Sequence, residues 1–322
     1  MYKRHTSYLV GAFFLLVSCS KDIYVDSCHY EHYSTKIDSS KSTNKVLIIG
    51  IDGFRSDAMT EQISPKIHSL FTQKNTYNNL EHKTEEDTYS GPNWSSILTG
   101  VHLNKHNVID NTFEGGNFIK YPSFFKYIEE HVPELNTASF VNWGPINKNV
   151  LSKEVDYAQD LENDSLVFQK SIELLENTNP FDVDIFFIHF DELDAAGHNF
   201  GFSKNINEYT ETITKLDYYV EKLYDIISNK RKTGENWLFI IVSDHGGDGT
   251  GHGDYDNIHI RNTIFLIEHP DTFFKNNHTS NMTDIAPTIL SFIGIQSTEF
   301  SCKKDGISLI KQYSTTNNQQ KR

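Results

Sequence analysis

Short apolar runs that end at an acidic residue constrain the fold of this chain more than any other feature. Residues 46–51 form a continuous apolar run, and Asp52 follows it directly. Similar short runs occur at residues 138–141, 184–190, 237–242 and 263–267. An uninterrupted run of this length is typical of a strand that is buried on both faces, as in a parallel sheet.

Helical patterns lie between these runs, at residues 123–131, 165–176, 206–229 and 283–293. Strands that alternate with helices indicate an α/β fold in which a mostly parallel central sheet carries helices on both faces. We expect one folded domain over residues 45–312, followed by a polar tail over residues 313–322.

The start of the chain has the pattern of an export signal. Lys3 and Arg4 precede an apolar run at residues 8–17. This run is about half of the roughly 20 residues that a helix needs to cross a bilayer, so residues 1–19 are predicted to be a signal peptide. No other stretch of the sequence is long and apolar enough to predict a membrane-spanning helix.

The end of this signal resembles a bacterial lipobox, with the residues Leu16, Val17, Ser18 and Cys19. In such signals the cysteine is lipidated, so we predict a lipoprotein that contacts the membrane only through Cys19, with residues 20–44 as a tether. Ser20 stands where Asp would favour the inner membrane, which indicates the outer membrane or cell surface. The alternative is a plain secretory signal in which Cys19 has no role.

Two more cysteines, Cys28 and Cys302, lie near the two ends of the mature chain. Disulfides persist outside the cytoplasm, so a bridge between them is one hypothesis, with two free thiols as the alternative.

The net charge limits the partners of this chain. Lys and Arg total 29 against 43 Asp and Glu, which gives a formal net charge of -14. Such a surface repels phosphate backbones, so no nucleic-acid polymer is expected as a partner. A small anionic substrate is compatible with this charge if metal ions reverse the field in the site.

Acidic residues follow three of the apolar runs. They are Asp52 after the first run, Asp191 and Asp194 after residues 184–190, and Asp244 after residues 237–242. Ligands of open α/β folds bind at the carboxyl ends of strands, so these carboxylates are expected near one site.

Histidines lie close to two of these acids. His198 follows Asp194 by four residues, His245 follows Asp244 directly, and His252 lies between two glycines. Histidine and carboxylate ligands suit zinc or another first-row divalent ion better than calcium. Any one of these histidines alone would be read as an ordinary surface or capped residue, whereas the joint set indicates a metal site.

Ser90 is expected at or just before a helix N-terminus, because Pro92 fits a first helical turn. A helix N-terminus with a hydroxyl group is a potential anion site. The alternative is a serine that only caps the helix.

Together these residues resemble the alkaline phosphatase superfamily and, within it, the nucleotide pyrophosphatase/phosphodiesterase branch. The resemblance runs from about Val46 to Ile295, with residues 283–288 similar to the last core helix of the superfamily. It rests on six motifs in order, at residues 51–53, 90–100, 106–111, 194–198, 243–246 and 251–253.

The resemblance implies a catalytic domain with two divalent ions, most simply Zn²⁺. It assigns Asp194, His198 and His252 to one ion. It assigns the second ion to Asp52, Asp244 and His245, with Ser90 directed toward it.

For the reaction, the resemblance implies hydrolysis of a small phosphoester with Ser90 as the nucleophile and a phosphoseryl intermediate. Asn111 and the backbone N–H of Gly91 would bind a phosphate oxygen. The phosphodiesterase branch usually carries Thr at the nucleophile position and phosphomonoesterases usually carry Ser, so both ester classes stay open.

Two other functions are compatible with parts of the pattern. Sulfatases of the same superfamily have Pro two positions and Arg four positions after their modified Cys or Ser; Pro92 fits this pattern and Trp94 does not. The second alternative is a non-catalytic surface lipoprotein that keeps the fold and binds a phosphoester.

Residues 113–160 are the candidate for a substrate-recognition cap. Four aromatic residues either stack on a leaving group or belong to the core: Trp94, Tyr121, Phe124 and Trp143.

Overall fold

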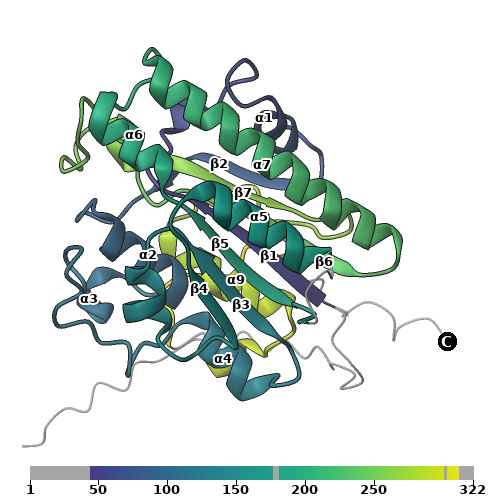
Figure 1. Ribbon diagram of the computed structural model, residues 1–322. Coiled ribbons are helices and arrows are strands. Elements are labelled where there is room, and N and C mark those ends of the chain that lie inside the picture. The colour runs from purple at the N-terminus through teal and green to yellow at the C-terminus, as the bar shows by residue number, and fades with distance from the viewer. Residues whose placement is uncertain (1–43, 177–180, 301–302, 312–322) are drawn as a thin grey trace, which may run out of the picture.

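The structure, a computed structural model, describes residues 44–176, 181–300 and 303–311. Seven strands of these described residues form one sheet in the order β2-β7-β6-β1-β5-β3-β4 (Figure 1). The strands are β1 (Asn44–Ile51), β2 (Thr76–Lys83), β3 (Thr137–Val141), β4 (Tyr157–Asp160), β5 (Ile185–Phe190), β6 (Asn236–Val242) and β7 (Asn262–Glu268).

The centre of the sheet is parallel, as the sequence predicted. β1 pairs in parallel with both β5 and β6, and β3 pairs in parallel with both β5 and β4. β7 is the exception, because it runs antiparallel to β6 and to β2. The apolar run at residues 263–267 predicted the strand, but a buried run carries no information about strand direction.

β2 and β4 form the two edges of the sheet, and the sequence did not predict either. β4 alternates between half-buried and exposed positions, and β2 exposes several of its polar residues. An edge strand needs no continuous apolar run, so this signal was missing.

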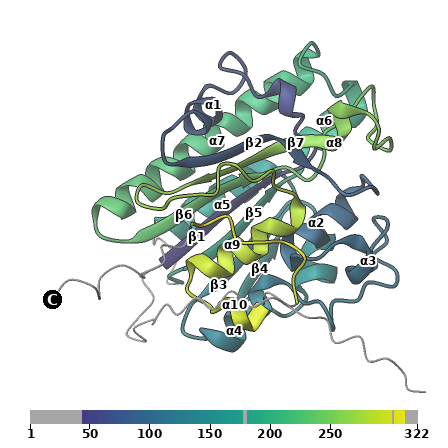
Figure 2. The same ribbon diagram turned by 180° about the vertical axis from the view of Figure 1, so that it is seen from behind.

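Helices cover both faces of the sheet, which confirms the predicted α/β architecture (Figures 1 and 2). One face carries α1 (Pro65–Phe71), α5 (Asp164–Leu175), α6 (Glu192–Phe200) and α7 (Asn207–Lys232). The other face carries α2 (Ser90–Thr99), α4 (Phe124–His131), α9 (Ile285–Phe292) and α10 (Ser297–Phe300). The shorter elements are α3 (Leu103–His106), α8 (Ile258–Arg261), two 3₁₀ helices (Ser56–Ala58 and Met282–Asp284) and a π-helical turn (Ile146–Leu151).

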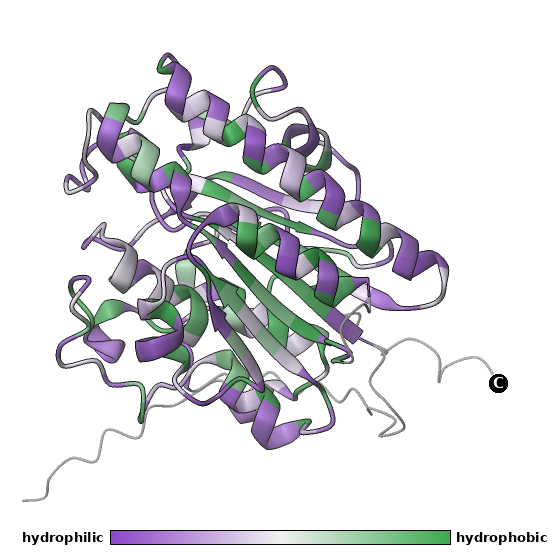
Figure 3. Ribbon diagram, in the orientation of Figure 1, coloured by the Kyte–Doolittle hydropathy of each residue, from purple (hydrophilic) through white to green (hydrophobic). Residues whose placement is uncertain are grey.

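Each face of the sheet has its own apolar core. Along β1, Val46 and Ile48 point into the core beneath α2, α4 and α9, whereas Leu47 and Ile49 point into the core beneath α1, α5 and α7. The central strands are hydrophobic over most of their length, while the outer faces of the helices are hydrophilic (Figure 3). This pattern explains why the buried runs of the sequence lack alternation.

Residues 113–160 do not form a separate cap. They contain α4, β3, the π-helical turn and β4, and the two strands extend the central sheet beyond β5. The apolar residues of β3 are buried, so they serve the core. Among the described residues, no helix is both long enough and apolar enough to cross a bilayer. The predicted signal peptide, most of the tether, the polar tail and the cysteines Cys19, Cys28 and Cys302 lie outside the described residues.

Candidate active site

The predicted site residues gather where β1, β5 and β6 end, side by side in the middle of the sheet. Asp52 follows β1 directly, Asp194 lies in the first turn of α6 after β5, and Asp244 follows β6. Because these three strands are parallel neighbours, their carboxyl ends meet at one edge of the sheet. In Figure 1 this edge lies between α2 and α6.

The chain after β1 is held tightly against this edge. The N–H of Gly53 donates to Oδ1 of Asp244 over 3.2 Å, and the N–H of Phe54 donates to Oγ of Ser243 over 2.9 Å. Gly53 has a φ of +71°, and an added Cβ would lie 3.0 Å from the Cα of Asp194. Glycine therefore allows the turn and the close approach of α6 at this position.

One cluster of ligand-type atoms consists of Asp194, His198 and His252, which lie within 4.8 Å of one another. His198 follows Asp194 by one helical turn in α6, and its Nε2 lies 3.3 Å from Oδ2 of Asp194. Nε2 of His252 lies 3.2 Å from Nε2 of His198. The structure thus brings together the three residues that the resemblance assigns to one ion.

A second cluster consists of Asp52, Asp194 and His245, also within 4.8 Å of one another. Nε2 of His245 lies 3.3 Å from Oδ1 of Asp52 and 3.4 Å from Oδ2 of Asp244. The predicted set of Asp52, Asp244 and His245 is therefore adjacent in space, and Asp194 lies next to both clusters. The sequence had placed Asp194 with one ion only.

The three histidines share one hydrogen-bonding arrangement. Each Nδ1 faces a backbone carbonyl at hydrogen-bond distance: His198 with Thr250 at 2.9 Å, His252 with Thr88 at 2.9 Å, and His245 with Gly246 at 2.8 Å. A carbonyl only accepts, so each Nδ1 carries the hydrogen and the neutral ring has its lone pair on Nε2. Metal-ligating histidines are commonly oriented in this way.

Two carboxylate oxygens at this edge lack a hydrogen-bond partner among the described residues. Oδ1 of Asp194 and Oδ2 of Asp244 are buried and make no hydrogen bond. A buried, unpaired carboxylate oxygen is costly, and a divalent cation compensates for it. These oxygens and the converging Nε2 atoms fit a metal ion in the composition and the orientation of their donors.

The surroundings of the site shift the pKa values of two carboxylates, Asp52 and Asp244, in opposite directions. Burial tends to raise the pKa of Asp52, but the hydrogen bond from His189 and the nearby imidazole of His245 lower it to about 2. Burial and the negative charge of Asp52 raise the pKa of Asp244 well above its usual range. Without a cation, the clustered carboxylates cannot all carry a negative charge at low cost.

The pKa values of two clustered histidines also separate. The hydrogen bond with Asp194 raises the pKa of His198 to about 9, whereas burial lowers the pKa of His252 to about 4. A metal ion at this cluster would have to displace the proton that His198 otherwise holds. The side chain of His198 is 44% exposed, so the cluster opens to solvent on this side.

Ser90 is the first residue of α2 and is only 6% exposed. Its Oγ lies 3.2 Å from Nε2 of His245 and 3.4 Å from Oδ1 of Asp52. Tyr89 is the N-cap residue of α2, and the capping position makes no side-chain hydrogen bond. The Ser90 hydroxyl is therefore directed at the second cluster and does not act as a simple helix cap.

Asn111 lies next to the first turn of α2. Its Oδ1 accepts a hydrogen bond from the backbone N–H of Gly91 over 2.7 Å. The predicted phosphate donor at Gly91 is thus already bonded to the other predicted donor. An Asn whose Oδ1 accepts in this way offers its Nδ2 hydrogens to a ligand.

The four candidate aromatic residues differ in burial. Trp94 and Phe124 are fully buried and belong to the core, so they do not stack on a leaving group. Trp143 and Tyr121 are half-buried. Tyr89, which was not predicted, is 43% exposed beside Ser90, and its ring contacts the edge of His252.

A third cluster is formed by Asp52, His189 and Asp191, and sequence reasoning missed its histidine. His189 lies within β5, where the surrounding apolar run masked it. Its polarity inside a fully buried strand was the available signal. Burial and the charge of Asp52 raise the pKa of Asp191 to about 7.

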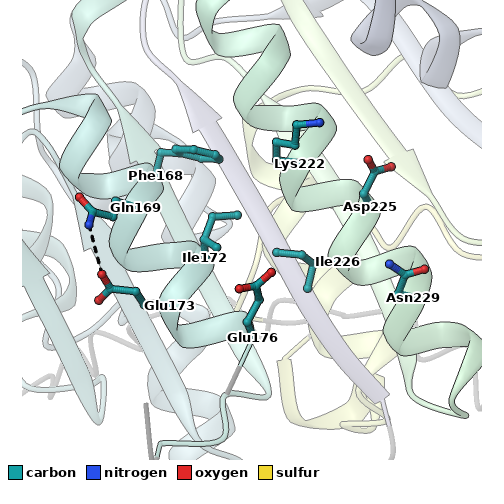
Figure 4. A pocket seen from close by; sticks show the side chains of 9 residues that line it. All are labelled: Phe168, Gln169, Ile172, Glu173, Glu176, Lys222, Asp225, Ile226 and Asn229. Atoms are coloured by element: carbon teal, nitrogen blue, oxygen red, sulfur yellow. Dashed lines mark hydrogen bonds between the residues drawn. The ribbon is translucent and has the colours of Figure 1, made fainter. Parts of the chain in front are cut away.

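A separate groove of about 540 Å³ lies between α5 and α7 (Figure 4). Ile172 and Ile226 face it, and Glu173 accepts a hydrogen bond from Gln169 over 3.4 Å. None of its lining residues belongs to the Asp/His clusters. The groove is therefore distinct from the candidate active site.

Comparison with known proteins identifies the family of this chain. A model of the family described as type I phosphodiesterase / nucleotide pyrophosphatase matches residues 46–130 and 126–279. The human bis(5'-adenosyl)-triphosphatase ENPP4 is 25% identical over 232 residues, which cover 65% of this chain and 48% of that protein. The 2,3-bisphosphoglycerate-independent phosphoglycerate mutase of Ureaplasma urealyticum is 29% identical over 168 residues, 49% of this chain and 32% of the mutase.

Solved structures share the fold at low sequence identity. The 2-O GAG sulfatase BT1596 superposes with a TM-score of 0.64 at 15% identity, covering 82% of this chain and 73% of the sulfatase. An inactive variant of murine ectonucleotide pyrophosphatase/phosphodiesterase 5 in complex with AMP gives a TM-score of 0.59 at 14% identity, covering 79% and 96%.

The chain spans 32% and 48% of the two curated relatives named above. The family match is more extensive, because it runs through β1, α2, α6 and the segment that carries His245 and His252. The chain belongs to the type I phosphodiesterase / nucleotide pyrophosphatase family, a branch of the alkaline phosphatase superfamily.

Proposed function

We propose that this protein hydrolyses a small phosphoric ester, with Ser90 as the nucleophile and two divalent ions at the Asp/His clusters. One observation carries the proposal: the Ser90 hydroxyl lies 3.2 Å from His245, at the place where the unpaired carboxylate oxygens and the Nε2 atoms converge. A hydroxyl that only caps a helix does not require carboxylate oxygens and imidazole nitrogens beside it.

Two groups of residues would hold the ions. The first group is Asp194, His198 and His252, and the second is Asp52, Asp244 and His245, with Asp194 next to both. When bound, divalent ions of this kind lower the pKa of a hydroxyl and stabilise negative charge on phosphoryl and leaving oxygens. His and Asp ligands favour Zn²⁺ among the candidate ions.

The chain itself positions the reacting groups. The Ser90 hydroxyl loses its proton to solvent as its Oγ attacks phosphorus, the ester oxygen leaves with its electron pair, and a phosphoseryl group forms on Ser90. Water then cleaves the Ser90 oxygen–phosphorus bond and releases phosphate or a phosphomonoester. The Nδ2 group of Asn111 would donate to a phosphate oxygen, a contact that can contribute about 3 kcal/mol in the transition state.

The choice between ester classes is open to a direct test. Purified protein with Zn²⁺ is assayed with p-nitrophenyl phosphate, bis-p-nitrophenyl phosphate and p-nitrophenyl sulfate, and kcat/KM is compared. Membership of a phosphodiesterase family supports the diester as the preferred substrate. Preference for the monoester would mean a phosphatase, and cleavage of the sulfate alone would contradict the proposal.

The nucleophile is tested by Ser90→Ala, which should lower kcat/KM at least about a thousandfold. Acid quenching of the wild-type reaction should trap phosphate on the peptide that contains Ser90. Ser139→Ala is a matched control, because Ser139 is also buried and hydrogen-bonded, to Asn147 over 2.6 Å, but lies in β3. If Ser90→Ala keeps the activity of this control, Ser90 is not the nucleophile.

We also propose that the enzyme is exported and anchored by a lipid on Cys19. The support is the basic start, the short apolar run and the lipobox-like residues at the end of the predicted signal. Metabolic labelling with a fatty acid should mark the protein, and Cys19→Ala should abolish the label. An unlabelled wild-type protein would leave the plain secretory signal as the explanation.

A further inference from the structure

The two carboxylate oxygens of Asp52 have different surroundings. Oδ1 faces the cluster, 3.4 Å from Oγ of Ser90 and 3.3 Å from Nε2 of His245. Oδ2 points the other way, where it lies 2.8 Å from Nε1 of Trp94 and 3.2 Å from Nε2 of His189. One oxygen is thus directed at the catalytic groups, and the other is occupied by two nitrogen atoms of the core.

The nitrogen of Trp94 can only donate, so Oδ2 of Asp52 accepts from it. His189 also acts as a donor here, because a hydrogen on its Nε2 matches the same acceptor oxygen. Its other nitrogen, Nδ1, is buried without a partner among the described residues. This arrangement is the reverse of that in His198, His245 and His252, where Nδ1 is bonded to a carbonyl and Nε2 faces the cluster.

Trp94 and His189 also hold each other in place. Their rings meet edge to face, with centroids 4.8 Å apart at 83°. The indole of Trp94 packs on the backbone of β1, since a Cβ added to Gly50 would lie 2.5 Å from it. All of Asp52, Trp94 and His189 are fully buried, so these side chains have little freedom to rearrange.

We propose that Trp94 and His189 are positioning residues that hold Oδ2 of Asp52 and thereby direct Oδ1 toward the metal site beside Ser90. The inference rests on the proposed function, because it concerns a ligand of the second ion. It also explains why Trp94 stands four positions after Ser90, where the sulfatase pattern has Arg: the indole N–H of Trp94 reaches Asp52.

The third cluster, Asp52, His189 and Asp191, is then not an ion site. A cation bound to Oδ2 of Asp52 would lie against the N–H groups of Trp94 and His189, which repel it. The ligand-type atoms are close together because Asp52 and His189 are hydrogen-bonded to each other. The folded protein should therefore bind two divalent ions per chain.

The test compares the full chain with Trp94→Phe, His189→Leu and His189→Gln. The first two changes remove one N–H donor each, whereas the Nε2 group of Gln can still donate to Asp52. Zn²⁺ content and affinity are measured against a chromophoric chelator, and the Co²⁺-substituted protein is examined by visible absorption. Kinetic constants with bis-p-nitrophenyl phosphate are measured in parallel.

Matched controls come from the same chain. Trp237 is fully buried and its Nε1 donates to Glu235 over 2.9 Å, but it lies at the opposite end of β6, so Trp237→Phe removes an equivalent bond away from the site. His82 is a fully buried histidine in β2, and His82→Gln controls for the histidine change. Far-ultraviolet circular dichroism identifies any variant that fails to fold, and a folded His189→Leu keeps the test valid if Trp94→Phe does not fold.

We expect Trp94→Phe and His189→Leu to bind the weaker of the two ions about 10- to 100-fold less tightly, with a changed Co²⁺ spectrum. His189→Gln should stay within about threefold of wild type, and both controls should match it. Wild-type affinity and spectrum in folded Trp94→Phe and His189→Leu would overturn the inference, as would a third ion that His189→Leu loses. A wild-type chain that binds no divalent ion would instead overturn the proposed function.

Discussion

The backbone N–H of Gly91 donates a hydrogen bond to Oδ1 of Asn111 over 2.7 Å, so the loop that carries Asn111 is joined to the first turn of α2. The contact is close: a Cβ added to Gly91 would lie 2.6 Å from the carbonyl oxygen of Asp110. The residue after Ser90 is therefore a glycine for lack of space, and Asn111 and Ser90 are held in a fixed relation.

Gly91→Ala should displace Asn111 and lower kcat/KM about 10- to 100-fold, because a shift of about 1 Å in a substrate-positioning group has an effect of this size. Gly253→Ala serves as the control, since a Cβ at Gly253 meets no atom within 4 Å. Steady-state kinetics with the preferred ester would measure both. Equal activity of the two variants would show that the loop adjusts at no cost.

Asn111→Asp distinguishes the two roles of the Asn111 side chain, which accepts a hydrogen bond from Gly91 and is proposed to donate one to the substrate. A carboxylate still accepts from the N–H of Gly91, but it cannot donate to a phosphate oxygen and it repels the anion. We expect kcat/KM to fall about 100-fold or more with the free energy of unfolding nearly unchanged. Loss of stability together with activity would mean that Asn111 acts only through its bond to Gly91.

Removal of divalent ions should destabilise the protein, because it leaves Oδ1 of Asp194 and Oδ2 of Asp244 buried without a hydrogen bond among the described residues. A chelator should lower Tm by several degrees, and excess Zn²⁺ should restore it. In Asp194→Asn, which changes the residue next to both clusters, the chelator should have a much smaller effect. A wild-type Tm that does not respond to chelator would contradict metal binding at this edge of the sheet.

Gly197 allows α6 to pack against Phe202. A Cβ added to Gly197 would lie 2.2 Å from the ring of Phe202, between the positions of Asp194 and His198 on α6. Gly197→Ala should cost about 1–3 kcal/mol of unfolding free energy, as measured in urea. The double variant Gly197→Ala, Phe202→Leu should recover part of that loss, and purely additive effects would argue against a direct clash.

Acid should destabilise the fold through a histidine outside the site. Burial lowers the pKa of His82 to about 3, whereas an unfolded histidine titrates near pH 6.5. Between these values only the unfolded chain binds the proton, so this contribution to stability is present above about pH 6.5 and is lost as the pH falls toward 3.

Between pH 7 and pH 5 the loss from His82 should be about 1 to 2 kcal/mol. Urea unfolding of the wild type and of His82→Gln at both pH values would measure it. The variant should show a smaller difference between the two pH values, whatever its stability at pH 7. An equal pH dependence in both proteins would assign the acid sensitivity to other buried groups, such as His106 and His269.

Much of the fold could be predicted from local pattern. Five buried strands and the helices α4, α5, α7 and α9 coincide with runs that are visible in the sequence. The direction of β7 and the edge strands β2 and β4 could not, because strand direction and edge position depend on pairing between distant segments. The expected cap at residues 113–160 failed for the same reason, since β3 pairs with β5 and β4 pairs with β3.

The sequence by itself determined which residues gather at the site, because Asp52, Asp194 and Asp244 each follow a buried strand and the ends of parallel strands meet. Only the tertiary structure decided how their atoms are used. The carbonyl that orients His198 belongs to Thr250, 52 residues away in the chain. The carbonyl that orients His252 belongs to Thr88, 164 residues away. Similarly, Oδ2 of Asp52 is occupied by Trp94 and His189, 42 and 137 residues away. Contacts over such separations follow from sheet order and helix packing, which residue spacing does not encode.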